Sequence, residues 1–191
     1  MIDLFKSKEK KHSEFLNEWR PIIQSAKNTM PDILPSLHQS YASFFIDEWN
    51  SQYEIAEEQE KIGLAVLAYR IKINQYATGM LIDGNEAIRL NGIKLLGYMR
   101  DEASWHVMSA LVKHENSETS FAAFGAALQI NERRACDEFF EFALLRKDWN
   151  AEAVANVLKD LVEVNIGEYI NKLDSSSVEQ KAELKQQFLR S

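Results

Sequence analysis

The sequence is poor in the residues that disulfide-stabilised, all-β and membrane-spanning proteins need. Its one cysteine, Cys136, cannot form a disulfide within the chain, which suits a reducing compartment. Seven glycines and three prolines in 191 residues are too few for the many turns of an all-β protein. No apolar run approaches the roughly 20 residues of a membrane-spanning helix. We therefore expect a cytoplasmic, all-α protein.

Positive charge is also in short supply. The formal net charge is -7, and a protein that neutralises phosphates needs a basic surface, so we expect no nucleic acid among its partners. The hydrophobic fraction of 46% is that of a globular protein with a real core. The length suits one domain, or one domain with a tail.

The start of the chain is locally basic. Lys6, Lys8, Lys10 and Lys11 fall within the first twelve residues, and no apolar segment follows them as in a signal peptide. We interpret this segment as a mobile or loosely helical arm. It is either a solvated terminus or a membrane-proximal basic arm attracted to anionic lipid. Pro21 is then expected in the first turn of a short helix that ends near residue 27.

Two helices are expected before residue 83. The first carries an aromatic stripe at helical spacing, which favours core packing; its members are Tyr41, Phe44, Phe45, Trp49 and Tyr53. The second covers about 56–73, and its acidic first turn suits the helix dipole. It is apolar nearly all round and should be central. Its expected main buried face comprises Ile62, Ala65, Val66, Tyr69 and Ile73.

A repeat begins after Asn85, which we expect to cap a helix. Shifting the sequence by 32 residues aligns Leu96 with Leu128, and a further shift of 33 residues reaches Leu161. A period of roughly 30–45 residues with two helices and a short turn is typical of an α-solenoid. Ser117 is expected to cap the helix that starts the next repeat. Residues 166–173 and 177–190 are interpreted as short amphipathic pieces, forming a polar end cap.

These patterns predict an α-α superhelix, a solenoid of antiparallel helix pairs with an N-terminal helical extension. We assign the basic arm and short helix to residues 1–36 and a single solenoid domain to 37–191. The clearest repeats lie within 85–164.

No catalytic motif stands out. The sequence lacks a His-Glu-x-x-His motif, a Gly-rich phosphate loop and a Cys-x-x-Cys pair. His106 and His114 are eight residues apart, about 12 Å along a helix, which is too far for one metal ion. Asp137 and Glu141 could form an acid–base pair, but the phenylalanines around them favour a solvated stripe on a buried helix. We expect Cys136 to be a small core residue, and we expect no cofactor and no metal.

Two motifs carry a resemblance to known proteins. Residues 85–164 resemble HEAT repeats of the short bacterial type, in which the first helix ends in a segment like residues 95–101 (LLGYMRD). The whole chain also resembles a bacterial group of membrane-associated HEAT-domain proteins. That match rests on residues 19–23 (WRPII), 34–35 (LP) and 44–50 (FFIDEWN). In that group a transmembrane helix usually precedes the basic run, and a membrane glycosyltransferase is often encoded nearby. No such apolar segment precedes the basic run here.

Solenoids bind proteins along the face built from their second helices. We therefore expect a non-catalytic scaffold or adaptor whose partner is another protein. The candidate contact residues are Glu102, Trp105, Ser109, Arg133, Asp137 and Glu141. Trp105 lies off the apolar stripe of its helix, so it is either an exposed binding residue or a packing residue between repeats. The resemblance implies an alternative, an accessory subunit of a membrane enzyme such as a glycosyltransferase. A third alternative is an enzyme, such as a HEAT-type lyase or a HEAT-type DNA glycosylase.

Overall fold

The computed structural model describes residues 2–83, 85–161, 164, 165, 167 and 169, without the side chains of 2–8 and Asp83. Throughout this part the regular structure is helical, so the predicted all-α class is confirmed. The chain divides into two compact units, Met1–Asp101 and Glu102–Ser191. The predicted tail pieces at 166–173 and 177–190 lie outside the described residues, apart from 167 and 169.

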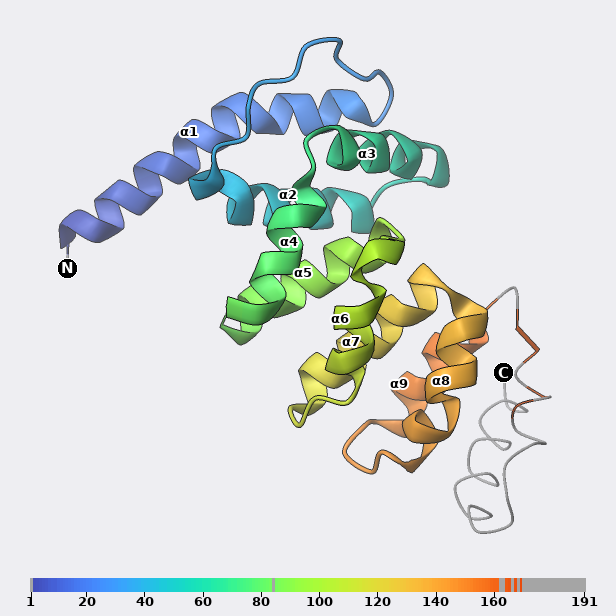
Figure 1. The fold of residues 1–191 in the computed structure, drawn as a ribbon. Coiled ribbons are helices and arrows are strands. Elements are labelled where there is room, and N and C mark those ends of the chain that lie inside the picture. Colours follow the sequence, from blue (N-terminus) through green and yellow to red (C-terminus); the bar gives the residue numbers. More distant parts are fainter. Residues whose placement is uncertain (1, 84, 162–163, 166, 168, 170–191) are drawn as a thin grey trace. The chain divides into compact units, whose positions relative to one another are not determined.

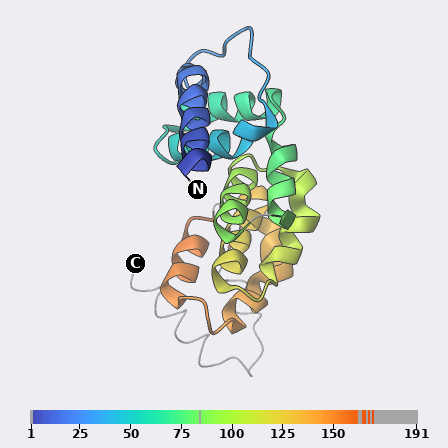
Figure 2. The same cartoon turned by 90° about the vertical axis from the view of Figure 1, so that its left-hand side faces the viewer.

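The first unit contains five α-helices and one 3-10 turn in its described part (Figure 1). They are α1 (Ile2–Ala26), η1 (Gln39–Tyr41), α2 (Ala42–Glu54), α3 (Glu58–Arg70), α4 (Ile73–Asp83) and α5 (Glu86–Tyr98). The second unit continues with helices that turn back on one another (Figure 2). They are η2 (Glu102–Ser104), α6 (Trp105–Val112), α7 (Ser117–Ile130), α8 (Glu132–Leu145) and α9 (Ala151–Lys159).

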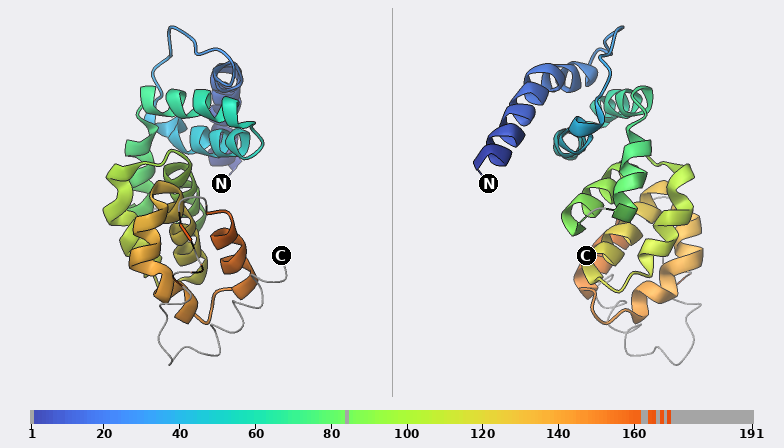
Figure 3. Two further views of the ribbon diagram at one scale, coloured as in Figure 1. Left: turned by 90° about the vertical axis from the view of Figure 1, so that its right-hand side faces the viewer. Right: turned by 60° about the vertical axis from the view of Figure 1, so that its left-hand side comes forward.

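The first helix differs from its prediction. A helix beginning at Pro21 was expected, whereas α1 begins at Ile2 and continues through Pro21 to Ala26. Its buried residues are Phe15, Trp19, Ile23 and Ala26, a stripe at helical spacing. Pro21 itself is exposed, so its missing hydrogen bond falls on the solvent side. Burial of the stripe outweighs the local preference for a break. The N-terminal turns of α1 extend beyond the other helices of this unit (Figure 3).

Three helices of the first unit run in the same direction. Arg20 of α1 pairs with Glu48 of α2 at 2.9 Å, and Gln24 donates to Gln52, again 28 residues later. Contacts that keep a constant sequence offset require parallel helices. From α2 to α5 the offset is 44, because Asn91 donates to Asp47 and Tyr98 to Glu54. Helix α3 returns antiparallel to α2, and α4 antiparallel to α5 (Figure 1).

Aromatic side chains of α2 form the centre of this unit, as the stripe predicted. Phe45 and Trp49 are fully buried. The Trp49 indole donates from Nε1 to the Leu64 carbonyl at 2.9 Å, which ties α2 to α3. Tyr53 stacks between Trp49 and Tyr98, with ring centroids 4.8 and 4.7 Å away. Burial is the main cause that raises the pKa of Tyr98 to about 12.

The helix expected at about 56–73 is α3, which ends at Arg70, whereas α4 was not predicted. Lys72 adopts a left-handed φ of 56° between them, and α4 starts at Ile73. The prediction missed α4 because no glycine or proline marks this break. The predicted buried face is wrong for three of its five members, although Ile73 is fully buried. Its members Ile62, Val66 and Tyr69 are 57%, 44% and 48% exposed, whereas the residues that face the core are Leu64, Leu67 and Ala68.

Asparagine begins four of the helices. The side chains of Asn85, Asn116, Asn131 and Asn150 each accept a hydrogen bond from the backbone N–H three residues later. This is the N-cap geometry that satisfies an otherwise unpaired helix donor. The prediction for Asn85 is confirmed, whereas the cap of α7 is Asn116 rather than Ser117. Asn131 also closes α7, so α7 and α8 meet at one residue.

The second unit is organised around Arg146, which follows α8. Its guanidinium donates to the carbonyls of His114 and Glu115, at 2.9 and 3.0 Å, and to the Ser120 hydroxyl at 2.9 Å. It also forms a two-point contact with the Asp148 carboxylate, at 2.7 and 3.0 Å. One side chain thereby joins the α6–α7 connection to the α8–α9 connection.

Within the described part of the chain, no helix combines the length and apolarity that crossing a membrane requires.

Candidate interaction surface

The predicted contact residues of the second unit lie on α6, α8 and the turn before α6. Trp105 is only 5% exposed, so of its two predicted roles the exposed binding residue is wrong and the packing residue holds. The guanidinium of Arg134 lies over its ring, 4.2 Å from the centroid, and Phe139 stacks at 6.3 Å. These two side chains of α8 cover the indole. Trp105 is a packing residue of this unit.

The remaining predicted contact residues form a polar surface. Arg133, Asp137 and Glu141 follow one another at four-residue spacing on the exposed side of α8. The Tyr169 hydroxyl donates to Asp137, and this bond raises the pKa of Tyr169 to about 12. Glu102 is exposed, and the Ser109 hydroxyl donates to the carbonyl of His106 at 3.0 Å. We call the exposed row of Arg133, Asp137 and Glu141 the charged α8 surface.

The basic arm is the start of α1. Lys10 and Lys11 are exposed, and Lys10 lies 3.8 Å from the Glu14 carboxylate. The side chains of Lys6 and Lys8 lie outside the described residues.

The described residues hold no group of three or more histidine, cysteine or acidic side chains that could bind a metal ion. Asp137, Glu138 and Glu141 are exposed, and Glu138 pairs with Arg134 at 2.8 Å, so the stripe is solvated as predicted.

Cys136 is buried, as predicted, and its reactivity can be tested. Burial, followed by the charges of Asp137 and Glu132, raises the pKa of its thiol to about 12. The thiolate is the reactive form, so we expect almost no labelling by a thiol-specific disulfide reagent in the folded protein. In concentrated denaturant we expect complete labelling. The pKa of the Cys136 thiol is higher in the folded than in the unfolded protein, so the protonated thiol contributes to the free energy of unfolding. This contribution is full below the unfolded pKa and is lost as pH rises towards 12. Fast labelling of the folded protein at neutral pH would contradict this prediction.

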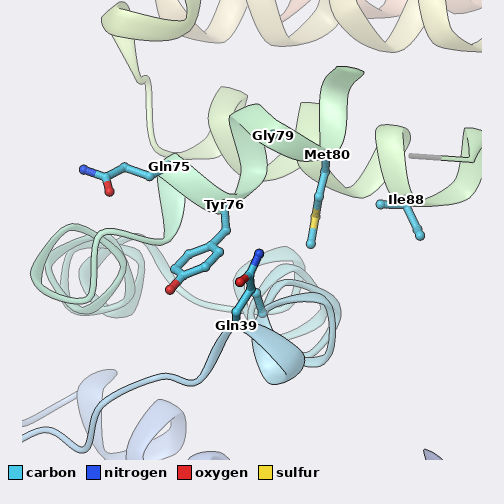
Figure 4. Close-up of a pocket in the computed structure, with 7 residues that line it drawn as sticks. Gln39, Gln75, Tyr76, Gly79, Met80 and Ile88 are labelled. Carbon is cyan, nitrogen blue, oxygen red and sulfur yellow. The ribbon is translucent and has the colours of Figure 1, made fainter. Parts of the chain in front are cut away.

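An open hollow of about 410 Å³ lies between η1, α4 and the start of α5. Figure 4 shows Gln39, Tyr76 and Met80 grouped in this region, while the amide of Gln75 points to the side. None of the lining residues is charged, so the hollow lacks the acid, base or metal ligands that most reactions need. We assign no chemistry to it. Its lining residues are Gln39, Ala42, Gln75, Tyr76, Gly79, Met80 and Ile88.

The most apolar exposed surface lies on α3. We define the exposed α3 face as Ile62, Val66 and Tyr69, which lie at i, i+4 and i+7 and therefore on one side of the helix. The opposite side of α3 is fixed against the core by Leu64 and Leu67. The Tyr69 hydroxyl donates to the Met99 carbonyl at 2.8 Å, which holds the outer end of the face in place.

Large exposed apolar side chains are concentrated around this helix. Of the seven in the described residues, five lie on α3 or are placed next to its ends. Ile55 is the C-cap of α2, three residues before α3 starts. Ile33 follows Asp32, whose carbonyl accepts a hydrogen bond from Arg70 at the end of α3. A concentration of exposed apolar side chains on and around one helix is typical of a protein-binding site.

Sequence reasoning missed this surface because α3 is apolar on two sides. Gly63 was the available signal. A Cβ at this position would lie 1.9 Å from the carbonyl oxygen of Ala26, so Gly63 marks the side of α3 that crosses α1 closely. The face carrying Ile62 and Val66 is then the outer one.

Comparison of this chain with protein-family models, with curated proteins and with solved structures finds no match.

Proposed function

We propose that this protein is a non-catalytic protein-interaction module, a scaffold or adaptor built as a HEAT-like α-solenoid. It binds another protein through apolar surface that the first unit leaves exposed on α3. Fold alone does not define an activity, so the proposal rests on a particular surface. The observation that carries it is the exposed α3 face.

Features inside each unit support the solenoid part of the proposal. In the first unit, antiparallel pairs are combined with parallel neighbours, since α1, α2 and α5 share one direction. Asparagine caps recur at the starts of α5, α7, α8 and α9. Stacked helix pairs with repeated caps are how α-solenoids are built, and their long faces bind proteins.

The exposed α3 face supports the binding part. Three large side chains project from a helix whose other side is buried, so they sit on a rigid element. Little backbone or helix ordering is then required on binding, which favours affinity. The charged α8 surface stays in the proposal as a second region of contact, through Arg133 and Glu141 and without the Trp105 indole as an anchor.

Site-specific photo-crosslinking tests the proposal. A benzophenone amino acid is placed at Ile62 or at Val66, and the protein is expressed and irradiated in its native host. We expect each position to give a discrete adduct with a protein, identified by mass spectrometry, because these side chains lie at the centre of the docking surface.

One exposed apolar position outside α3 in the same unit provides the control. Ile82 on α4 is 70% exposed, so it is open to the same random collisions. We expect no discrete adduct there. If positions 62 and 66 give no adduct, or the same adducts as position 82, α3 is not a docking surface and the proposal fails.

A further inference from the structure

We infer that the exposed α3 face docks on the same face of a second copy of this chain, with the two α3 helices antiparallel about a twofold axis. This inference names the partner and rests on the proposed function. It is argued from the order of charged and apolar residues along α3 and from the charges at its two ends.

The outer side of α3 carries a row at four-residue spacing. The row is Glu58, Ile62, Val66 and Arg70, with Tyr69 beside it. Residues four apart form the ridges through which helices pack together. The acidic residue begins the row, the two branched apolar residues occupy its middle, and the cationic residue ends it.

The two ends of α3 carry opposite charge. At the start, Glu57 and Glu58 are exposed, and the Glu58 side chain is 89% exposed although it pairs with Lys61. At the end, Arg70 donates to the carbonyls of Pro31 and Asp32, at 2.9 and 3.0 Å. These bonds hold its guanidinium in place and leave other N–H groups free for a carboxylate.

Two more cations lie at the end of α3. Lys72 lies two residues after Arg70, and Arg100 follows Met99, whose carbonyl binds the Tyr69 hydroxyl. Both are exposed, with left-handed φ angles of 56° and 50°. Neither forms an ion pair with the residues that the structure describes. The end of α3 is therefore cationic, opposite in charge to its acidic start.

An antiparallel twofold pairing matches every member of the row. Residues related by such an axis exchange places, so residue i of one copy meets residue j of the other and j meets i. With the axis at the level of residue 64, Glu58 faces Arg70 and Ile62 faces Val66, in both directions. A parallel pairing would instead place like charges together. The row is therefore complementary to itself in one orientation only.

The small area of one helix face limits the expected affinity of the dimer. Stable interfaces bury roughly 1,200–2,000 Å², and a single pair of helices covers less than that. The α3 face has three large apolar side chains in its exposed middle. We therefore expect a weak dimer whose population depends on protein concentration.

Sedimentation equilibrium of the purified chain over a wide concentration range tests the inference. We expect reversible dimer formation, and we expect Val66→Glu to raise the dissociation constant at least tenfold, because it places a carboxylate in the apolar middle of the row. Leu145→Glu, at a comparably exposed apolar site on α8, should leave the constant unchanged. Circular dichroism checks that each variant is folded.

Charge exchange then tests the orientation. Glu58→Arg and Arg70→Glu should each weaken the homodimer, because each single substitution places like charges opposite one another in both pairs. Mixing the two variants should restore association, since both pairs then have opposite charge. If Arg70→Glu is unfolded, Arg70→Gln replaces it, because its mixture with Glu58→Arg has one pair of opposite charge and no pair of like charge. A second charge variant of this kind keeps the test decisive.

Several outcomes would overturn the inference. They are a wild-type chain that remains monomeric at every concentration, a dimer that Val66→Glu does not weaken, and a mixture that associates no better than its components. The proposed function fails separately. Adducts of positions 62 and 66 with a different protein would leave the protein-binding module standing with a heterologous partner.

Discussion

Gly63→Ala is expected to destabilise the first unit by about 2 kcal/mol or more, although alanine is the better helix former. Alanine favours a helix interior by roughly 1 kcal/mol. Here its Cβ would lie 1.9 Å from the Ala26 carbonyl oxygen, 3.0 Å from the Ala26 carbonyl carbon and 3.3 Å from the Lys27 carbonyl oxygen. These are backbone atoms, so the end of α1 must move away from α3. Overpacking of this kind typically costs about 1–3 kcal/mol or more.

Urea denaturation followed by circular dichroism measures this effect, with Gly79→Ala as the matched control. Gly79 lies in α4 of the same unit, and a Cβ there meets nothing within 4 Å. Only the helix preference acts at this position, so we expect a gain of about 0.5–1 kcal/mol. The sign of the change should therefore differ between the two glycines. Equal effects would mean that α1 and α3 do not cross as closely as the structure shows.

Arg146→Ala is expected to destabilise the second unit by about 3 kcal/mol. The Arg146 side chain is 14% exposed and donates to two backbone carbonyls, one hydroxyl and one carboxylate. Removing it leaves these acceptors without their donor, and each such loss costs about 1–3 kcal/mol when the group is buried. Water can partly reach the connection at His114 and Glu115, so the total loss in the free energy of unfolding is smaller than the sum of these values.

Two substitutions control for charge and for position. Arg146→Lys keeps the charge but loses the planar fork that reaches four residues, so we expect it to recover less than half of the loss. Lys147→Ala changes an exposed neighbour and should alter the free energy of unfolding by less than about 0.5 kcal/mol. Amide hydrogen exchange of residues 114–120 should be faster than in the wild type for Arg146→Ala but not for the two control variants. Unchanged protection there would show that the arginine does not hold this connection.

The same contact predicts a dependence on pH. The hydrogen bond from Arg146 is the main cause that lowers the pKa of Asp148 below its ordinary value. A lowered folded pKa stabilises the protein above the unfolded pKa, and this contribution disappears as pH falls through the folded pKa. The free energy of unfolding, measured as a function of pH, should therefore fall less steeply in acid for Arg146→Ala than for the wild type.

Local patterns in the sequence predicted several features that the structure confirms. The scarcity of turn residues predicted an all-α chain, and the aromatic spacing of α2 predicted the burial of Phe45 and Trp49. Asn85 was identified as a cap because capping depends on a hydrogen bond to a residue only three positions away. Cys136 was placed in the core from its position on an apolar stripe.

The errors concern features that depend on contacts between distant residues. The continuation of α1 through Pro21 depends on packing of Trp19 against Phe45, whose rings lie 5.3 Å apart. The burial of Trp105 depends on Arg134, which is 29 residues away in the chain. Neither contact leaves a periodic signal in the sequence.

The sequence alone was sufficient to predict the class of fold, most of the helix starts and the buried side of helices with one apolar stripe. Each of these follows from local hydrogen bonds or from the periodicity of a single helix. The side of α3 that faces outward could be assigned only from the tertiary structure, because both sides are apolar. The close approach of Gly63 to the Ala26 carbonyl determines which side is buried. That choice exposes Ile62, Val66 and Tyr69, and with them the surface on which the proposed function rests.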